Sequence, residues 1–293
     1  MRSLLFVPAD SPRKLEKSLA SGADALILDL EDSVATENKA AARRTALAFL
    51  REQRGERGRP RLLVRINGLD SGLADLDLDV AITGAPDAVM LPKASGGADV
   101  RLLDARLSVR EALHGLAPGS TGIVALATET PAGIFGIGSY AGSSARLEGL
   151  SWGAEDLSAE IGALATRDAS GAWTEPFRLA RNLMLFAASA AGVAAIDTVY
   201  VSFRDEAGLL REAREAARDG FTGKLAIHPA QVPLINEAFT PDADAVRHAE
   251  RVVQAFASAS NAGVASLDGR MLDRPHLALA RRVLARRPPG GAD

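Results

Sequence analysis

The sequence contains no cysteine among its 293 residues and only four histidines. The missing cysteine excludes disulfides, thiolate metal ligands and a cysteine nucleophile together. A chain without cysteine also suits a reducing compartment, and we predict a cytoplasmic protein.

Long hydrophobic runs and a dominant charge are also missing. The most apolar stretch, residues 183–195, is too short to span a bilayer, and the opening MRSLLFVPADSPRK reaches a proline and an aspartate too early for a signal peptide. The formal net charge is only -3, from 34 basic and 37 acidic residues that are interspersed. We therefore expect no membrane partner and no nucleic-acid partner, and a local cationic site must hold any anionic substrate.

Aromatic residues are scarce, at 4% of the chain, whereas hydrophobic residues make up 47% and charged residues 24%. This composition is typical of a soluble globular protein, and its core must be largely aliphatic. The length exceeds the common single-domain size but suits an α/β barrel, which takes about 250 residues.

Short apolar runs alternate with longer amphipathic segments as far as about residue 238. Near-continuous apolar strands separated by helices indicate a parallel sheet covered on both faces. Eight such pairs, with no GxGxxG motif after the first strand, favour a closed (β/α)8 TIM barrel of the α/β class over an open dinucleotide-binding sheet. The predicted strands are residues 3–8, 25–30, 62–66, 88–91, 122–128, 147–152, 195–201 and 224–227.

The chain continues beyond the eighth pair, although a barrel needs no more to close. The sequence predicts a helix over residues 242–260, a hairpin in NAGVASLDGRMLD, a basic helix over residues 275–287 and a frayed tail, PPGGAD. We predict a catalytic barrel domain over residues 1–240 and a C-terminal helical arm over residues 241–293. Such an arm can cover a face of the barrel or reach a neighbouring subunit.

Charged side chains follow most of the predicted strands. The carboxyl ends of barrel strands meet at one rim, where barrel enzymes carry their reacting groups. We therefore expect these side chains to converge. They are Asp29, Glu31 and Asp32 after the second strand, Arg65 in the third, Lys93 after the fourth, Glu129 after the fifth, Glu155 and Asp156 after the sixth, and His228 after the eighth.

Glu129 and Asp156 form the clearest pair among these side chains. Two carboxylates from neighbouring strands, in a chain with few histidines, suit Mg2+ with water and substrate completing its coordination. The alternative is that each carboxylate caps the helix that follows it, as Asp and Glu often do.

The basic side chains have one strong and two weaker interpretations. Arg65 would place a guanidinium at the barrel mouth, where it can grip a carboxylate through two parallel hydrogen bonds, or pair with an acid after the second strand, or do both. Lys93 could form a Schiff base, although a lysine paired with a carboxylate is the more common case. His228 could shuttle protons, but a bond to a neighbouring backbone carbonyl is favoured.

Seven segments stand out in order: LFVPADSPRKLEKSLASGADALILDLEDSV, VRING, MLPKA, ETPAGI, GAEDLSAEIG, KLAIHPAQV and GRMLDRPHLALA. Together they resemble the citrate lyase beta-subunit-like family of the HpcH/HpaI aldolase superfamily. The resemblance spans nearly the whole chain and implies a (β/α)8 barrel. It is looser in PAGIFGIGSYAG, where relatives commonly have ETARGV, and this departure concerns the wall of the substrate pocket.

The resemblance also implies a site. It implies Mg2+ held by Glu129 and Asp156, with Glu129 next to the substrate, and a 2-oxoacid carboxylate gripped by Arg65. It further implies that Asp273, in GRMLDRP, reaches the active site of an adjacent subunit and exchanges a proton with the thioester, so that the enzyme is a homo-oligomer, a trimer by analogy with relatives. The alternative is that Asp273 only caps the last helix.

The implied reaction is cleavage or formation of a 3-hydroxy-acyl-CoA such as citramalyl-, malyl- or citryl-CoA, with a 2-oxoacid and an acyl-CoA as the small-molecule partners. One alternative is the lyase (beta) subunit of a citrate lyase complex, which acts on a citryl acyl carrier. Another is a metal-dependent pyruvate aldolase without a thioester substrate. A barrel that has lost its chemistry is a third, and the presence together of Arg65, Glu129, Asp156 and Asp273 argues against it.

Overall fold

The structure, a computed structural model, describes residues 1–259 and 263–287. The chain divides into two compact units, Met1–Asn236 and Glu237–Asp293. The predicted tail PPGGAD, the last residue of the predicted helix 242–260 and the first two residues of the predicted hairpin lie outside the described residues. Our assignment of a catalytic domain and an arm that meet at residue 240 stays a prediction.

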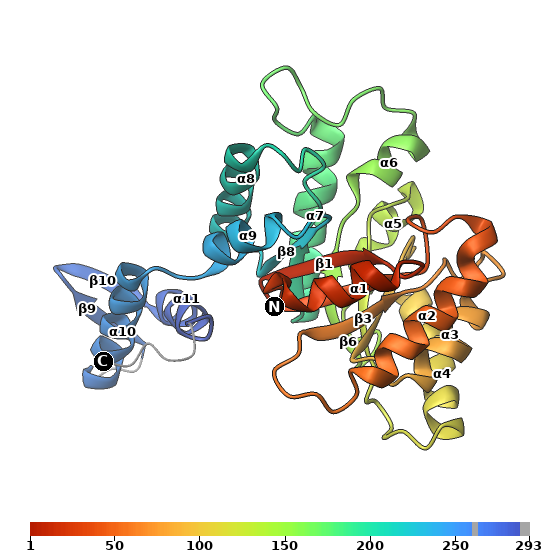
Figure 1. Ribbon diagram of the computed structural model, residues 1–293. Helices are drawn as coiled ribbons and strands as arrows, with labels where there is room; N and C mark the ends of the chain where they lie inside the picture. Colours follow the sequence, from red (N-terminus) through yellow and green to blue (C-terminus); the bar gives the residue numbers. More distant parts are fainter. Residues whose placement is uncertain (260–262, 288–293) are drawn as a thin grey trace. The chain divides into compact units, whose positions relative to one another are not determined.

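Parallel strands of the first unit close into a barrel. The strand β1 (Ser3–Pro8) pairs in parallel with β2 (Ala25–Asp29) on one side and with β8 (Gly223–Ala226) on the other, so the sheet closes in chain order (Figure 1). The predicted TIM barrel is therefore confirmed. The strands between them are β3 (Arg61–Arg65), β4 (Ala88–Leu91), β5 (Gly122–Leu126), β6 (Leu147–Ser151) and β7 (Ala194–Asp197).

Helices connect the strands and lie outside the barrel, as a parallel sheet requires. Figure 1 shows the second, third and fourth of them side by side along one flank. The helices are α1 (Pro12–Ser18), α2 (Lys39–Glu52), α3 (Ala74–Thr83), α4 (Gly97–Leu113), α5 (Pro131–Gly136), α6 (Ala154–Ile161), α7 (Glu175–Ala191), α8 (Glu206–Asp219) and α9 (Gln231–Phe239).

The interior of the barrel is aliphatic, as the scarcity of aromatic residues predicts. Leu4, Ile27, Met90, Ile196 and Leu225 belong to its buried cluster. Because successive side chains of a strand point to opposite faces, their neighbours in sequence face the surrounding helices.

One outward-facing side chain is a fully buried lysine. The Nζ of Lys224 lies 2.7 Å from Asp197 Oδ2 and 2.8 Å from Glu212 Oε1, and Asp197 also accepts a hydrogen bond of 2.7 Å from Trp152 Nε1. Burial raises the pKa of Asp197, but the charges of Lys224 and Arg181 outweigh burial and leave it below its ordinary value. A buried cation is tolerated only with such partners. The network therefore ties the ends of β6 and β7 to β8 and α8.

Several predicted strands extend past the observed ones. The predicted strand 195–201 is β7 in the structure and ends at Asp197, where its ladder with β8 also ends. Beyond that point the backbone has no partner strand, and the apolar Val201 is half exposed in a rim loop. Hydropathy alone therefore overestimated the strand, because apolar residues continue after the pairing stops.

In the second unit, the described residues that follow α9 form a hairpin and two helices. The helix α10 (Ala243–Ser258) begins after Asp242, whose side chain accepts a hydrogen bond of 2.7 Å from the Ala245 N–H. Phe256 and Leu272 belong to the apolar cluster of this unit. The remaining elements are the antiparallel strands β9 (Val264–Leu267) and β10 (Arg270–Asp273) and the helix α11 (Arg274–Leu284).

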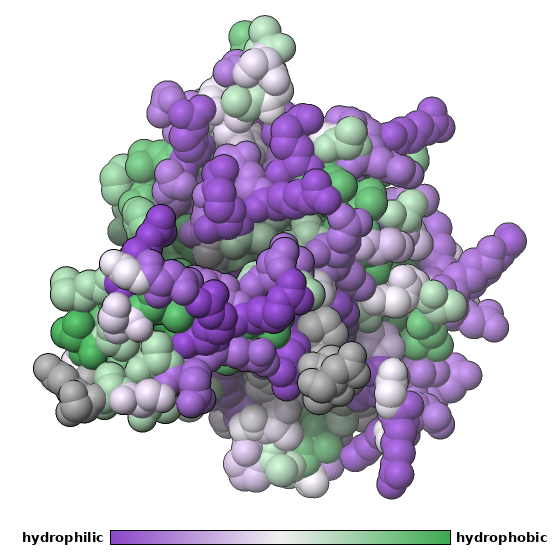
Figure 2. Space-filling model, turned by 90° about the vertical axis from the view of Figure 1, so that its left-hand side faces the viewer, coloured by the Kyte–Doolittle hydropathy of each residue, from purple (hydrophilic) through white to green (hydrophobic). Residues whose placement is uncertain are grey.

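Over residues 1–259 and 263–287, no helix is long and apolar enough to cross a membrane. The face in Figure 2 is mostly hydrophilic, with smaller hydrophobic areas between the polar side chains. Exposed large apolar side chains, such as Leu113 and Phe186, occur on several helices. Scattered residues of this kind are common on protein surfaces and do not by themselves mark a binding site.

Candidate active site at the barrel rim

The carboxyl ends of the strands bring charged side chains from five neighbouring strand ends together. Asp29 and Arg65 are the last residues of β2 and β3, Lys93 and Glu129 follow β4 and β5, and Asp156 lies in the first turn of α6 after β6. Asp29, Arg65 and Glu129 are buried, whereas Lys93 and Asp156 are partly exposed. The predicted convergence of these residues at one rim is therefore present in the first unit.

Arg65 is held by acidic neighbours. Its Nε and Nη2 each donate a hydrogen bond of 2.7 Å to the Asp29 carboxylate, its Nη1 lies 3.0 Å from Glu31 Oε2, and its guanidinium lies 4.7 Å from the centre of the Phe6 ring. Burial raises the pKa of Asp29, but Arg65 outweighs burial and holds it below its ordinary value. The structural salt bridge is thus present, and Asp29 takes only two of the five guanidinium donors.

Lys93 contacts three carboxylates through its ammonium. Its Nζ lies 2.6 Å from Glu31 Oε1, 3.4 Å from Asp32 Oδ2 and 3.4 Å from Asp156 Oδ1. Burial lowers the pKa of Lys93, but its bond and attraction to Glu31 outweigh burial and raise it. The amine therefore stays protonated, which favours the predicted ion pair over a Schiff-base nucleophile.

Glu129 is almost completely buried beside a second carboxylate. Its side chain accepts a hydrogen bond of 2.6 Å from the backbone N–H of Lys93, and the residue is 3% exposed. Burial, followed by the negative charge of Asp156, raises the pKa of Glu129 to about 8, and Arg65 offsets this only in part. The nearby cations therefore compensate the pair only in part, and its hard oxygen donors fit Mg2+.

The helix-capping alternative does not describe Glu129. The helix that follows it, α5, has Thr130 as its N-cap, and the Thr130 hydroxyl accepts a hydrogen bond of 3.1 Å from the Gly133 N–H. Asp156 does lie in the first turn of α6, where a carboxylate also favours the helix dipole. Metal binding and helix stabilisation are compatible for Asp156.

Gly153 leaves the space that Glu129 occupies. A Cβ atom built on Gly153 would lie 2.7 Å from Glu129 Cγ and 3.0 Å from its Oε1. The sequence did not indicate this role, because the contact joins two strand ends that are far apart in the chain. The glycine in GAED was the available signal.

Gly153→Ala is expected to weaken Mg2+ binding by about 10–100-fold, the usual cost of disturbing a group that orients a metal ligand. The added methyl group would push the Glu129 carboxylate out of position. Titration calorimetry with Mg2+ measures the effect. Gly138→Ala is the matched control, because no atom lies within 4 Å of its added Cβ, and unchanged affinity in the Gly153 variant would contradict the assignment.

Asp273 belongs to the second unit, so the structure does not bring it together with the rim residues. It is the last residue of β10 and the N-cap of α11. The Nδ1 of His276 lies 2.5 Å from Asp273 Oδ1 and accepts a hydrogen bond of 3.3 Å from the Asp273 N–H, and both side chains are half exposed. The capping position predicted as an alternative is therefore present. The three-residue spacing from Asp273 to His276 is the sequence signal of this pairing.

Two further predicted rim residues have no such role. Glu155 is exposed. His228 is exposed, its Nδ1 accepts a hydrogen bond of 3.2 Å from the Ala230 N–H, and its ring stacks on Phe203 with centroids 5.1 Å apart. The prediction of a bond to a backbone carbonyl was wrong, because the ring nitrogen faces the N–H of the turn that follows.

A cavity opens beside the rim residues. It has a volume of about 400 Å3 and is lined by Glu31, Lys93, Lys39, Asn67 and Ser71, among others. Over residues 1–259 and 263–287, no group of three or more His, Asp or Glu side chains is arranged to hold a metal. A metal at this rim would therefore use two protein carboxylates and complete its coordination with water and substrate.

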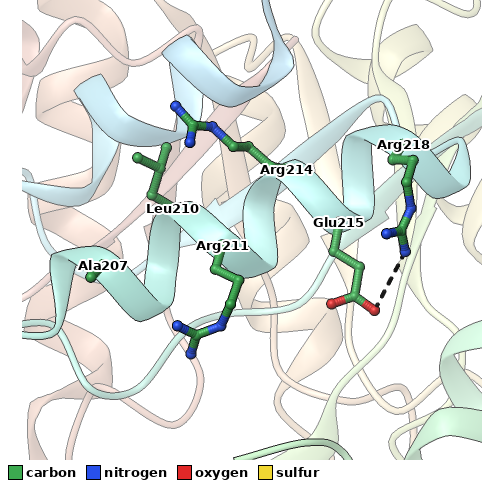
Figure 3. Close-up of a pocket in the computed structure, with 6 residues that line it drawn as sticks. All are labelled: Ala207, Leu210, Arg211, Arg214, Glu215 and Arg218. Carbon is green, nitrogen blue, oxygen red and sulfur yellow. Dashed lines mark ion pairs between the residues drawn. The ribbon is translucent and has the colours of Figure 1, made fainter.

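A groove of about 540 Å3 lies along α8, away from these residues (Figure 3). The side chains that line it all come from α8, and the ion pair drawn joins Arg218 to Glu215 at 3.8 Å. Figure 3 shows Arg211 and Arg214 pointing to opposite sides of the helix. Because these side chains diverge, we place the candidate site at the rim.

The chain matches the HpcH/HpaI aldolase/citrate lyase family over residues 2–229. It is 39% identical over 287 residues to citrate lyase subunit beta of Escherichia coli (strain K12), a match that covers 97% of this chain and 92% of that protein. It is 34% identical over 299 residues to mitochondrial citramalyl-CoA lyase of Rattus norvegicus, with 97% and 85% covered. A crystal structure of protein CitE from Mycobacterium tuberculosis, in complex with magnesium, acetoacetate and coenzyme A, has a TM-score of 0.78 and 36% identity, with 97% of each chain covered.

Proposed function

Because the chain belongs to the HpcH/HpaI aldolase/citrate lyase family, we propose that it is a magnesium-dependent carbon–carbon lyase acting on a 3-hydroxy-acyl-CoA. The products of cleavage are a 2-oxoacid and an acyl-CoA, and citramalyl-, malyl- and citryl-CoA are the candidate substrates. The observation that carries the proposal is the buried Glu129 beside Asp156 and Arg65, at the rim where barrel enzymes carry their chemistry. The similarity to citramalyl-CoA lyase, and to a structure with magnesium and coenzyme A, supports it.

Glu129 and Asp156 are the residues that would hold the metal. The raised pKa of Glu129 reflects burial and the like charge of Asp156, and a divalent cation compensates both effects. When bound, Mg2+ supplies positive charge that stabilises the negative charge developing on substrate oxygen. The Lys93 N–H donates a hydrogen bond to Glu129 Oε2 and so fixes one oxygen of the carboxylate.

Arg65 would bind and orient the oxoacid carboxylate. Asp29 fixes one edge of the guanidinium and the Phe6 ring faces it, so the group has little freedom to rotate. The donors that neither Asp29 nor Glu31 uses can hold a carboxylate in a planar, two-bonded geometry. Fixing the oxoacid in this way places its carbonyl carbon for attack or release of the thioester carbon.

Asp273 would transfer a proton to or from the α carbon of the thioester. In cleavage it protonates the α carbon of the thioester enolate, and in the reverse direction it removes that proton. We propose that Asp273 acts in the site of a neighbouring copy, so that the active enzyme is a homo-oligomer, a trimer by analogy. The side chain of Asp273 is half exposed, which leaves its carboxylate accessible to a substrate.

The test is mass-spectrometric detection of coenzyme A products after incubation with Mg2+ and citramalyl-, malyl- or citryl-CoA, with and without a chelator. Release of acetyl-CoA that the chelator stops supports the proposal, and the substrate that is cleaved identifies the acid. No cleavage of any of these substrates would contradict it. Activity only with a citryl acyl carrier would indicate a citrate lyase subunit, and activity only with a hydroxy-oxoacid would indicate a pyruvate aldolase.

Mg2+ binding is expected to tighten as the pH rises from about 6 to 8, because Glu129 must lose its proton before it binds a cation. The pKa of metal-free Glu129 is raised to about 8 by burial and by Asp156. Below about pH 8, the Kd for Mg2+ should fall about tenfold for each unit by which the pH rises. Close to one proton should be released for each cation bound. Calorimetry in two buffers of different ionisation enthalpy measures both quantities, and a Kd that does not change with pH would contradict the role of Glu129.

The raised pKa of Glu129 also predicts how the stability of the metal-free protein depends on pH. The folded chain keeps the Glu129 proton up to about pH 8, whereas the unfolded chain releases it near the ordinary value of 4.5. The folded state therefore binds more protons between these values, and the free energy of unfolding falls as the pH rises through them. Saturating Mg2+ should remove this dependence, which serves as the control.

A further inference from the structure

The rim carries more acidic side chains than one divalent cation needs. Asp29, Glu31, Asp32, Glu129 and Asp156 all lie there, and a metal at the proposed site uses only the last two. The guanidinium of Arg65 compensates the charge of Asp29 through two hydrogen bonds. Between that pair and the metal site, Glu31 contacts both this guanidinium, at 3.0 Å, and one ammonium, and Asp32 contacts the same ammonium.

The ammonium is that of Lys93, and it contacts three carboxylates. Its Nζ is 2.6 Å from Glu31, 3.4 Å from Asp32 and 3.4 Å from Asp156, one of the proposed metal ligands. In enzymes with two metal ions, the two cations lie about 3.5–4 Å apart, and carboxylates can bind both of them. The Lys93 ammonium likewise contacts both a proposed metal ligand and the acids beyond it.

The backbone of Lys93 is adapted to this position. Its φ is 52°, in the left-handed region, which is unfavourable for most residues with a side chain and is easily adopted by glycine and asparagine. In this conformation the Lys93 N–H donates to Glu129 Oε2 at 2.6 Å, while the side chain reaches Asp156. One residue thus contacts both proposed metal ligands, one through its backbone and the other through its side chain.

We propose that Lys93 is a positioning residue whose ammonium replaces a second metal ion and holds the site to one divalent cation. This inference rests on the proposed metal site at Glu129 and Asp156. An ordinary surface ion pair would affect stability slightly and leave the number of bound metal ions unchanged. The number of cations bound per chain therefore separates a positioning role from a purely structural one.

The test is to count Mn2+ ions bound per chain by electron paramagnetic resonance in the full-length wild type, Lys93→Asn, Lys93→Gly and Lys93→Arg. Asparagine and glycine accept the left-handed backbone and so keep the N–H to Glu129, but both remove the charge. Arginine keeps the charge. We expect one Mn2+ in the wild type and in Lys93→Arg, and two in each neutral variant, with the spectrum broadened by coupling between neighbouring ions.

One Mn2+ in all four proteins would overturn the inference and leave the proposed metal site intact. No Mn2+ in the wild type would instead contradict the metal site itself, so the two failures are distinguishable. Adding Asp32→Asn to Lys93→Asn locates the second ion, because it removes an acid that the ammonium contacts while Glu129 and Asp156 remain. The double variant should return to one ion, and two ions in it would contradict the assigned position.

Discussion

Asp156→Asn is expected to lower the rate of thioester cleavage by about 10²–10³-fold or more, since removing one group that stabilises developing charge has an effect of this size. The substitution removes one of the two carboxylates proposed to hold Mg2+ and leaves an amide of the same shape. The side chain is 29% exposed, so the fold should be little affected. Mg2+ titration, steady-state rates and thermal unfolding measure binding, activity and stability separately.

Glu155→Gln is the matched control for Asp156→Asn. Glu155 precedes Asp156 in the same turn of α6, but it is exposed. Its neutralisation should leave Mg2+ affinity and turnover close to those of the wild type. Undiminished turnover in Asp156→Asn, or in the wild type with an excess of chelator, would contradict the metal assignment.

Asp273→Ala is expected to lower turnover by about 10²–10⁴-fold, the usual contribution of a general acid or base. Binding of oxaloacetate or pyruvate to the rim should persist, because the substitution leaves Arg65 and the metal ligands unchanged. Asp273 is also the N-cap of α11, so the alanine variant should lose about 1 kcal/mol of stability as well. Rates and oxoacid binding by calorimetry give the two readouts.

Asp273→Asn separates the two roles of this residue. Asparagine is as good an N-cap as aspartate, but it cannot transfer the proton. The variant should therefore regain the stability lost in Asp273→Ala and remain inactive. If it keeps wild-type activity, Asp273 only caps the helix. Oligomers mixed from the Asp156→Asn and Asp273→Asn proteins should recover part of the activity if Asp273 serves a neighbouring copy, and no recovery would count against that arrangement.

The barrel could be predicted because its signal is repeated along the chain. Each of eight apolar runs is followed by an amphipathic segment, and an error of a few residues in one run does not alter the repeat. The error at β7 is of this kind, since Val201 is as apolar as the residues of the strand but lies in a loop after the pairing with β8 has ended. Strand ends depend on the partner strand, which hydropathy does not encode.

The site could be predicted only as a set of residue types at strand ends. Arg65 illustrates this limit, because the sequence allowed either a salt bridge or a substrate contact, and the structure shows the bidentate bond to Asp29. The left-handed backbone of Lys93 and the space at Gly153 for Glu129 are tertiary features with no periodic signal. Both became visible only when the strand ends were placed next to one another.

The most direct test is anomalous diffraction from crystals grown with Mn2+ and pyruvate. We expect one anomalous peak per chain, beside the carboxylates of Glu129 and Asp156, with the pyruvate carboxylate within hydrogen-bonding distance of Arg65. A peak at any other position, or pyruvate bound away from Arg65, would contradict the proposed active site.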